Sequence, residues 1–410
     1  MTRIGIIGAG IIGTTIALRL IADGHDVTLI DADPDGLPTS SGNASLIARP
    51  EIAPIASPGI IRSVPGWLLD PLGPLTVRWG DLLALTPWLM AFLAASVPAR
   101  VDAGRRALAF LMRTALEDHQ ALEAEAGLSG HFGERGYLAL HDTPRSLEAG
   151  AEEQARVKNL LGYEFEVLDP AAARRLVPQL EGPFAGAIHQ PGYWSVGNPL
   201  TMLRDYQGVV RGRATLRQGK AVAIDQRPDA VAIRLASGEE LNFEQVVVAA
   251  GVWSRDLVRQ LDLGVLLETE RGYNTTYTDL DWNLPMPVGF ADHGFIASPL
   301  VDGLRIGGAV ELARPEAPPN FRRAAAMRQK MRRYVPALPE GGREWMGRRP
   351  SVPDSVPVIS LHPDDRRIAF AFGHGHLGLT LSAVTARLVA SLLREGPRDE
   401  LRPYDIQRFQ

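Results

Sequence analysis

The stretch IGIIGAGIIG, residues 4–13, decides the fold of this chain. A short apolar run, Ile4–Ile7, is followed by Gly8, Gly10 and Gly13 with the spacing G-x-G-x-x-G. In this pattern the first glycine permits a tight turn, the second lets the backbone approach a pyrophosphate, and the third lets a helix pack closely on a strand. The stretch therefore predicts a strand, a turn and a helix that together hold a dinucleotide.

The residues that follow complete one β-α-β unit. GTTIALRLIADG (13–24) has the apolar spacing of an amphipathic helix, and DVTLID (26–31) is typical of a second strand. Asp31 ends that strand, 18 residues after Gly13, where an acid suits a ribose 2′-hydroxyl and repels a 2′-phosphate. NADP is therefore disfavoured, and the choice between a nicotinamide and a flavin stays open at this point.

Length and composition narrow the function classes. With 410 residues the chain is long enough for two domains, since single cores rarely grow beyond ~250–300 residues. The net charge of −4 does not favour a nucleic-acid partner, which usually needs a basic excess. The absence of cysteine excludes disulfides, cysteine metal sites, a cysteine nucleophile and a cysteinyl cofactor link, and it fits a cytoplasmic setting.

Further elements follow from apolar periodicity and turn chemistry. We expect strands at 136–142, 214–226, 230–236, 243–250, 294–299, 303–309 and 368–371, and helices at 100–126, 156–161, 170–176, 321–334 and 380–394, with an irregular segment from 52 to about 98. The uncharged run 82–99 contains Pro87 and Pro98, so it predicts a buried or surface-lying helix rather than a membrane span.

Three more motifs carry chemistry. VVVAAGVWS (246–254) is a buried strand that ends in small residues, which let another group pass close to the backbone. FGHGHLGLTLSAVTARLV (372–389) places glycines before a helix whose N-terminus can stabilise negative charge developing on a ligand. WMGRRPSVPDSVPVIS (345–360) contains Arg349, whose guanidinium is suited to bidentate binding of a substrate carboxylate. His374 and His376 have no acid or third histidine near them in sequence, so we expect no metal.

Taken in order, these motifs resemble the D-amino acid oxidase superfamily of FAD-dependent oxidoreductases, and most of all the bacterial D-amino acid dehydrogenases. The resemblance extends over TSSGNASLI (39–47), GYLALHD (136–142), ERGYNTTY (270–277), GLRIGGAVEL (303–312), GRRPSVPDSVPVI (347–359) and GHGHLGLTLS (373–382). The stretch SPGIIRSVPGWLLDPLGPL (57–75) points to the dehydrogenase branch.

The resemblance implies an α/β (mixed α+β) fold, in which a Rossmann-type FAD-binding domain is interleaved with a substrate domain built on a mixed or antiparallel sheet. We assign 1–80, 165–262 and 345–410 to the FAD-binding domain, and 81–164 and 263–344 to the substrate-binding domain.

The resemblance also assigns roles to residues. Arg349 falls on the arginine that binds the substrate carboxylate, and Tyr273, His293, Phe295 and His376 are candidate substrate contacts. No catalytic acid or base is named, because hydride transfer is centred on the flavin. The expected cofactor-binding residues are Gly8, Gly10, Ile12, Gly13, Asp31, Ala32, Ser40, Ser41, Asn43, Ala44, Ser45, Leu46, Val222, Ala250, Gly251, Trp253, Gly375, His376, Leu377, Gly378, Leu379 and Thr380.

The implied cofactor is FAD, and we expect it to be non-covalent. Covalent attachment in related amine oxidases uses cysteine or histidine, whereas this chain has no cysteine and no histidine between His25 and His119. The three lysines, Lys158, Lys220 and Lys330, lie outside the flavin-facing motifs, which argues against an efficient oxidase.

The implied reaction is oxidative deamination of a D-amino acid, in which a hydride passes from Cα to flavin N5 and the imino acid is hydrolysed to a 2-oxo acid. The open alternatives are oxidation of a secondary amine or imino acid (D-proline, hydroxy-D-proline, sarcosine or glycine), a flavin-binding subunit of a heteromeric dehydrogenase, and an NAD-dependent dehydrogenase. The electron acceptor is a quinone, a carrier or O₂. No protein partner is predicted.

The apolar segment 60–99, with Trp67, Trp79 and Trp88, suggests peripheral contact with the inner face of the cytoplasmic membrane, the alternative being a buried helical face.

Overall fold

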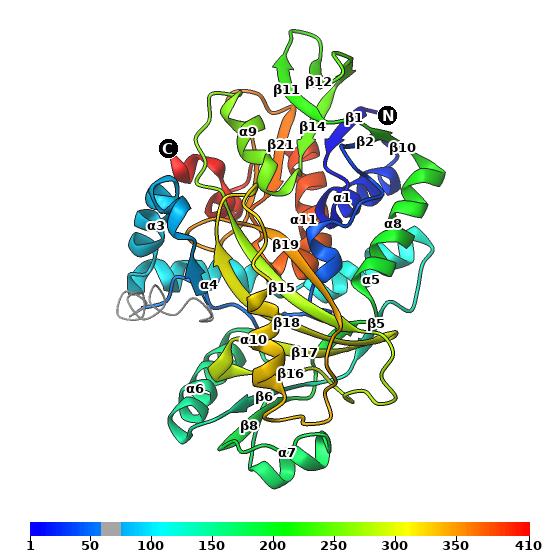
Figure 1. Ribbon diagram of the computed structural model, residues 1–410. Coiled ribbons are helices and arrows are strands. Elements are labelled where there is room, and N and C mark those ends of the chain that lie inside the picture. The colour runs from blue at the N-terminus through cyan, green and yellow to red at the C-terminus, as the bar shows by residue number, and fades with distance from the viewer. Residues whose placement is uncertain (59–74) are drawn as a thin grey trace.

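Two large β-sheets dominate the computed structural model, which describes residues 1–58 and 75–410. One sheet lies in the upper half of Figure 1, and the other extends from the middle to the bottom. Most of the 57–75 stretch, including Trp67, lies outside the described residues.

The upper sheet has six strands, and it carries the predicted β-α-β unit. Every neighbouring pair is parallel except the last, which is antiparallel. In spatial order the strands are β10 (Thr215–Gln218), β2 (Asp26–Asp31), β1 (Arg3–Ile7), β14 (Gln245–Val248), β21 (Ile368–Phe372) and β20 (Val358–Leu361). The predicted Rossmann-type arrangement and mixed α/β class are confirmed.

Both faces of this sheet are covered, because alternate side chains of each strand point to opposite faces. Ile4 and Ile6 pack under one helical layer, whereas Ile7 belongs to the core on the other face. The helices of the first layer are α1 (Ile11–Ala22), α5 (Ala115–Ala126), α8 (Pro199–Arg213) and α11 (Gly378–Glu395). Thr15 in α1 donates a hydrogen bond to the Ser382 carbonyl in α11 at 3.0 Å, so the first and last helices of the sheet are in direct contact.

The opposite face carries a small antiparallel sheet and a short helix. These elements are β11 (Ala221–Gln226), β12 (Val231–Leu235), β13 (Glu240–Phe243) and α9 (Ser254–Arg259). The β11–β12 hairpin lies at the top of Figure 1.

The second large sheet has nine strands and is mixed. Only the β16–β6 and β18–β4 pairs are parallel. In spatial order the strands are β19 (Arg343–Ser351), β15 (Glu268–Tyr277), β18 (Gly303–Leu312), β17 (Phe295–Leu300), β16 (Val288–Phe290), β6 (Tyr137–His141), β8 (Gly186–Gln190) and β7 (Glu166–Leu168), with β4 (Leu75–Val77) beside β18.

The remaining elements connect or cover the two sheets. A third small sheet contains β3 (Leu46–Ile47), β9 (Trp194–Val196) and β5 (Phe132–Glu134). The other helices are α3 (Leu82–Ala95), α4 (Pro98–Met112), α6 (Pro144–Leu161), α7 (Pro170–Leu176) and α10 (Arg322–Met331). Short 3₁₀ turns are η1 (Thr39–Gly42), η2 (Trp79–Asp81), η3 (Gly251–Trp253), η4 (Ala291–His293), η5 (Gly375–Leu377), η6 (Asp399–Tyr404) and η7 (Ile406–Phe409).

Several predicted elements need correction. The expected strand 214–226 is two strands, because the chain leaves β10 at Gly219 and Lys220 and enters a different sheet as β11. The expected helix 100–126 is α4 and α5, with a break between Met112 and Ala115. Within the segment 52–98, which was expected to be irregular, α3 occupies most of the run 82–99 for which a buried or surface-lying helix was predicted. The helix expected at 156–161 is the end of α6, which begins at Pro144 and is capped by Thr143, whose hydroxyl accepts from the Ser146 amide at 3.1 Å. No strand was predicted for β15 or β19.

The predicted domain boundaries remain a prediction. All six strands of the upper sheet lie in segments assigned to the FAD-binding domain. However, β7 and β8, which lie within 165–262, belong to the nine-stranded sheet.

The helical segment Gly375–Glu395 is long and apolar enough to cross a membrane by composition alone. Its apolar window is 78% buried inside the protein, as expected for a core helix. The pair 79–95 and 98–126 is bent by 92° at the break between the two segments.

Candidate functional site

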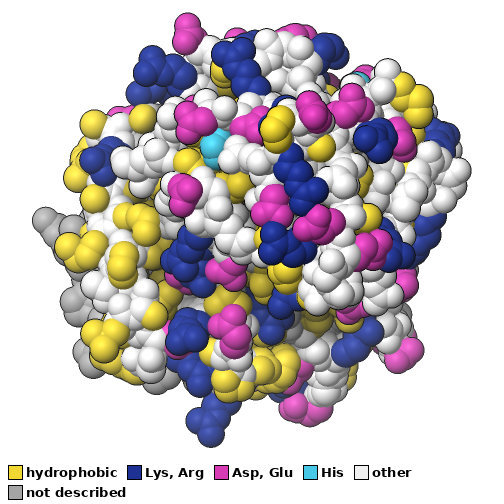
Figure 2. All heavy atoms as spheres, turned by 90° about the horizontal axis from the view of Figure 1, so that it is seen from above, with side chains coloured by type: hydrophobic (Ala, Val, Ile, Leu, Met, Phe, Trp, Pro, Cys, Tyr) yellow, Lys and Arg dark blue, Asp and Glu magenta, His cyan; other side chains and the backbone are white. Residues whose placement is uncertain are grey.

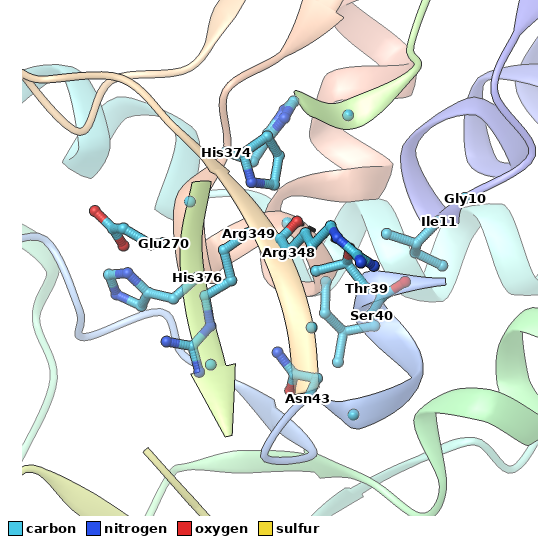
Figure 3. Close-up of a pocket in the computed structure, with 18 of the residues that line it drawn as sticks. Gly10, Ile11, Thr39, Ser40, Asn43, Glu270, Arg348, Arg349, His374 and His376 are labelled. Atoms are coloured by element: carbon cyan, nitrogen blue, oxygen red, sulfur yellow. Dashed lines mark hydrogen bonds between the residues drawn. The ribbon is translucent and has the colours of Figure 1, made fainter. Parts of the chain in front are cut away.

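A large cavity lies between the two big sheets. Its volume is about 1260 Å³, compared with roughly 300–1,000 Å³ for typical small-molecule sites. Figure 3 shows its two ends: Gly10 and Ile11 lie on one side, and Arg349, His376 and Glu270 lie on the other. The cavity therefore has room for a dinucleotide together with a small substrate.

The glycine motif forms one end of the cavity. Gly8 has φ +109°, and a Cβ there would lie 2.4 Å from the Ala249 carbonyl oxygen. A Cβ on Gly13 would lie 1.8 Å from the Gly8 carbonyl oxygen, so Gly13 is required for α1 to pack on β1. Gly10 lines the cavity and has no protein atom within 4 Å of a Cβ position. Unpaired N–H groups at the start of α1 therefore face open space suited to a pyrophosphate.

Asp31 shapes the ribose end of the same cavity. Its carboxylate accepts hydrogen bonds from the backbone N–H groups of Ala9 at 2.7 Å and Asp33 at 2.8 Å. Asp31 and Ala32 both line the cavity. Because each carboxylate oxygen has a second lone pair, Asp31 can still accept a bond from a ribose hydroxyl.

Four more of the predicted cofactor-binding residues, Val222, Ala250, Gly251 and Trp253, line the cavity. The β11–β12 register shifts between Ala221 and Ala223, so Val222 lies in a bulge with no cross-strand partner. Its carbonyl accepts from the Gln260 side chain at 2.7 Å. Trp253 is 52% exposed.

The loop 39–46 runs along the middle of the cavity and is fastened to the nine-stranded sheet. The buried Arg305 guanidinium donates to the Ser41 carbonyl at 3.0 Å and the Asn43 carbonyl at 2.7 Å. Asn274 donates to the Gly42 carbonyl at 2.9 Å. Burial lowers the pKa of Arg305 to about 10. Sequence motifs did not identify Arg305 or Asn274, because they act on the loop backbone rather than on a ligand.

Not every predicted residue of this loop faces the cavity. Ser40, Asn43, Ala44 and Leu46 line it. Ser41 is buried and donates to the Pro38 carbonyl at 2.7 Å, and Ser45 is fully buried with φ +60°. Neither serine is among the lining residues, so both support the loop from behind.

The start of α11 forms part of the cavity wall. Gly375, Gly378, Leu379 and Thr380 line it, whereas Leu377 is buried behind them. The Thr380 hydroxyl accepts from the Ala48 amide at 2.9 Å, which holds the loop after β3 against this helix end. The positive end of the helix dipole is therefore directed at the cavity.

Arg349 is the central charge of the opposite end. Its guanidinium lies over Gly272 of β15, where a Cβ would be only 2.4 Å from the nearest guanidinium nitrogen. Within residues 1–58 and 75–410 the guanidinium has no hydrogen-bond acceptor or ion-pair partner. Burial lowers its pKa, and the nearby Glu270 carboxylate opposes that change. An unpaired, desolvated guanidinium facing a cavity is suited to bind a ligand carboxylate.

Two titratable groups accompany Arg349. Glu270, its register partner on β15, is 2% exposed. One carboxylate oxygen of Glu270 accepts from the Ser351 hydroxyl at 2.6 Å and the other has no partner, while burial raises its pKa. His376 lines the cavity, and burial together with the charge of Arg349 lowers its pKa to about 4. His376 is therefore neutral at physiological pH and does not compete for the carboxylate.

The structure places the other three predicted substrate contacts in different surroundings. Phe295 lines the cavity and stacks on Phe290, with ring centroids 4.4 Å apart. Tyr273 also lines it, but its hydroxyl donates to Glu311 and accepts from the Asn320 amide, so the phenol is already paired. His293 does not line the cavity; its Nε2 lies 2.9 Å from Asp142 and 2.8 Å from the Tyr334 hydroxyl.

Sequence analysis missed several residues of this cavity. Glu51, Glu270, Tyr137 and Tyr193 all line it. They come from separate loops and strands without a shared motif, and only the fold brings them together. In the described part of the chain, no group of three or more His, Asp or Glu could hold a metal ion.

Comparisons with known proteins find matches along almost the whole chain. The sequence model of the family described as FAD dependent oxidoreductase (DAO) matches residues 3–392. A D-amino-acid oxidase of Bradyrhizobium diazoefficiens is 33% identical over 427 aligned residues, covering 99% of each chain. A D-amino acid dehydrogenase of Methylobacterium nodulans is 30% identical over 406 residues, covering 95% of each chain.

Solved structures match the fold over the same length. A glycine oxidase from Geobacillus kaustophilus gives a TM-score of 0.74 at 20% identity, covering 100% of this chain and 99% of its own. An L-proline dehydrogenase from P. horikoshii gives a TM-score of 0.75 at 18% identity, covering 100% and 97%.

Proposed function

Because the chain belongs to the family of FAD-dependent oxidoreductases, we propose that it oxidatively deaminates D-amino acids, as the names of its relatives from Bradyrhizobium and Methylobacterium indicate for those proteins. FAD is the cofactor, and the substrate is a small amino acid. The cavity fits both, since Gly10 leaves open space at the start of α1 and the volume is about 1260 Å³.

The observation that carries the proposal is the unpaired Arg349 guanidinium. It lies in the same cavity as the glycine motif and the first turn of α11, at the end opposite Gly10. An amino acid bound by its α-carboxylate to Arg349 is thereby held in the cavity that also contains the cofactor site. Such orientation can lower the barrier of a reaction by several kcal/mol, about 7–11 at most.

The chemistry divides between cofactor and protein. When bound, FAD supplies the acceptor for the hydride that leaves Cα. Arg349 binds and orients the carboxylate, and the start of α11 stabilises negative charge on a group lying against it. The apolar Phe295 excludes water from its part of the cavity wall. We expect FAD to be non-covalent, because the chain has no cysteine.

An anaerobic reduction experiment tests this function. The purified holoprotein is mixed with D-amino acids, their L-enantiomers, D-proline, hydroxy-D-proline, sarcosine and glycine, and the long-wavelength absorbance of oxidised flavin is followed. Bleaching by primary D-amino acids is the expected result. Bleaching only by secondary amines or glycine would replace the proposal with the amine-oxidising alternative, and a flavin that no member reduces would contradict it.

We propose in addition that electrons leave to a membrane quinone or carrier, and that the protein is cytoplasmic with peripheral contact at the inner membrane face. Support comes from η2 and α3, where Trp79, Leu83 and Met90 are 65%, 90% and 62% exposed. Figure 2 shows hydrophobic side chains gathering at the left edge, the side where α3 lies in Figure 1. Such an apolar surface is typical of an interfacial helix.

Vesicle sedimentation tests the membrane contact. Wild type should sediment with phospholipid vesicles, and a Leu83→Ser/Met90→Ser variant should not, while both keep the same flavin reduction rate. Reoxidation of the reduced protein by air and by a soluble quinone then compares the two acceptors. Wild type that stays in the supernatant, or faster reoxidation by air, would contradict this part of the proposal.

A further inference from the structure

One part of the cavity wall is acidic and aromatic, and the proposed reaction gives it no role. It is formed by Glu51, Tyr137 and Tyr193, which we call the phenolic end. Glu51 lies in the segment that follows β3, Tyr137 begins β6, and Tyr193 precedes β9.

Among the residues that the structure describes, Glu51 has no counter-ion. Its side chain is accessible from the cavity, and in the described part of the chain its carboxylate has neither a hydrogen-bond donor nor an ion-pair partner. The surrounding protein raises the pKa of this carboxyl, and so does the negative charge of Glu153. Glu51 is an exposed residue that lines the cavity. A carboxylate without a protein partner is available to a ligand cation, and a hydrogen bond between charged groups is stronger than one between neutral groups.

The neighbouring acid illustrates the contrast. Glu153 of α6 also lines the cavity, but Arg105 pairs with it and Arg156 donates to it at 3.0 Å. Arg105 and Arg156 therefore neutralise Glu153, whereas no described residue neutralises Glu51.

The two tyrosines supply an independent sign of a ligand. Tyr193 is only 2% exposed, and its hydroxyl reaches the cavity without a hydrogen-bond partner among the described residues. Tyr137 lies beside it with ring centroids 5.0 Å apart, and its hydroxyl occupies the space left by Gly289, where a Cβ would be 1.9 Å away. Neutral phenols offer both acceptor oxygens and ring faces, and both attract a cation.

The phenolic end lies apart from Arg349 across the nine-stranded sheet. The Arg349 guanidinium lies over Gly272 of β15 and the Tyr137 hydroxyl lies against Gly289 of β16, with β18 and β17 between these two strands. The negative charge of Glu51 raises the pKa values of Tyr137 and Tyr193, as expected for a carboxylate on their side of the cavity. The α-ammonium and the carboxylate of an amino acid are both attached to Cα, so the ammonium stays close to Arg349 when the carboxylate is bound there. A cation that reaches Glu51 must therefore be on the substrate side chain.

We propose that Glu51, together with the Tyr137 and Tyr193 phenols, binds a cationic substrate side chain, so that the enzyme prefers D-amino acids ending in a guanidinium or ammonium group. This inference rests on the proposed function, since it assigns the substrate class of the same cavity.

Matched substrate pairs test the preference. D-Arginine and D-citrulline have nearly the same shape but differ in charge, and D-lysine and D-norleucine form a second pair. Wild type should favour the charged member about 10- to 100-fold in kcat/KM, the range of a hydrogen bond to a charged group. Glu51→Gln should bring both ratios close to one while leaving the neutral substrates unchanged.

Glu148→Gln is the control variant. Glu148 is an exposed acid on α6 that does not line the cavity, so the variant removes one negative charge without touching the phenolic end. It should keep the wild-type ratios. Equal use of charged and neutral substrates by wild type would overturn the inference and leave the proposed function intact. A loss of activity in Glu51→Gln that is the same for all D-amino acids would overturn it too, since Glu51 would then serve the α-amino group.

A binding measurement separates this inference from the reaction itself. 5-Guanidinopentanoate is arginine without its α-amine, so it cannot be deaminated, and it should perturb the flavin spectrum of wild type at lower concentration than hexanoate. Glu51→Gln should abolish that difference. Tighter binding of the guanidino acid with no D-amino acid reducing the flavin would support the phenolic end and reject the proposed reaction. Equal binding of both acids would reject the phenolic end.

Discussion

At the scale of single residues, the cavity depends on charges that lack protein partners. Arg349 could be predicted from sequence, because it stands in a short motif on an extended segment. Glu51, Tyr137 and Tyr193 could not, because a lone acid and two tyrosines have no characteristic spacing, and only the folded chain brings them to one cavity. His293 was wrongly expected at the cavity, since its ring is bound to Asp142 and Tyr334.

Replacement of Arg349 by lysine should weaken substrate binding. Lysine keeps the charge but loses the planar fork that binds a carboxylate with two parallel bonds. We expect the substrate Kd from anaerobic titration to rise about 10- to 100-fold, with FAD content unchanged. Arg343→Lys, at the exposed start of the same strand, is the control. An unchanged Kd in Arg349→Lys would remove this residue from the substrate site.

His374 should make the protein sensitive to acid. Burial lowers its pKa from 6.5 to about 3, and its Nε2 lies 3.0 Å from the Thr385 hydroxyl. Between those pH values the unfolded chain binds a proton that the folded chain does not, so stability falls as the pH drops below 6.5. The loss is about 2 kcal/mol by pH 5.

Urea unfolding at pH 6.5 and at pH 5 measures this effect. His374→Asn should lose less stability than wild type over that interval, and His25→Asn, in the turn after α1, should behave as wild type. An equal loss in wild type and His374→Asn would show that other groups cause the acid sensitivity.

At the scale of elements, the β-α-β unit and the closing strand and helix were predicted nearly to the residue, because glycine spacing and apolar periodicity are local signals. The paired strands β15 and β19 were missed. Most residues of β15 are buried, so it lacks the alternation of polar and apolar residues by which a half-exposed strand is recognised. The 214–226 segment was wrongly joined, since a change of sheet leaves little trace in hydropathy.

Two glycines of the first turn should differ in what they control. Gly13→Ala should destabilise the protein without cofactor by about 1–3 kcal/mol, because its Cβ would meet the Gly8 carbonyl. Gly10→Ala should keep the stability of the apoprotein but bind FAD weakly, because its Cβ would meet only cavity space. Thermal unfolding of the apoprotein and a fluorescence titration with FAD measure the two effects. Equal apoprotein stability in both variants would contradict the packing role of Gly13.

At the scale of the whole molecule, the cavity lies between the two sheets, so one ligand should stabilise both. FAD at 100 times its Kd should add about 2.7 kcal/mol to the stability of the apoprotein. Hydrogen exchange should then slow in α1 and in β19 together. ADP, which reaches only the glycine-motif end, should slow exchange in α1 and leave β19 unchanged. Protection by FAD limited to the six-stranded sheet would contradict a shared cavity.

The contact between α1 and α11 has a consequence for how the protein is made. Thr15 and Ser382 meet across nearly the full length of the chain, and β1 and β21 flank the same central strand, β14. During translation β1 and α1 leave the ribosome long before residues 368–395. The apolar side of α1 is therefore exposed until α11 has been synthesised and can pack against it. Because residues 8–12 line the same cavity as Gly375 and Gly378, we expect FAD to be taken up only after α11 has left the ribosome. We also expect nascent chains to depend on protection of α1 until then.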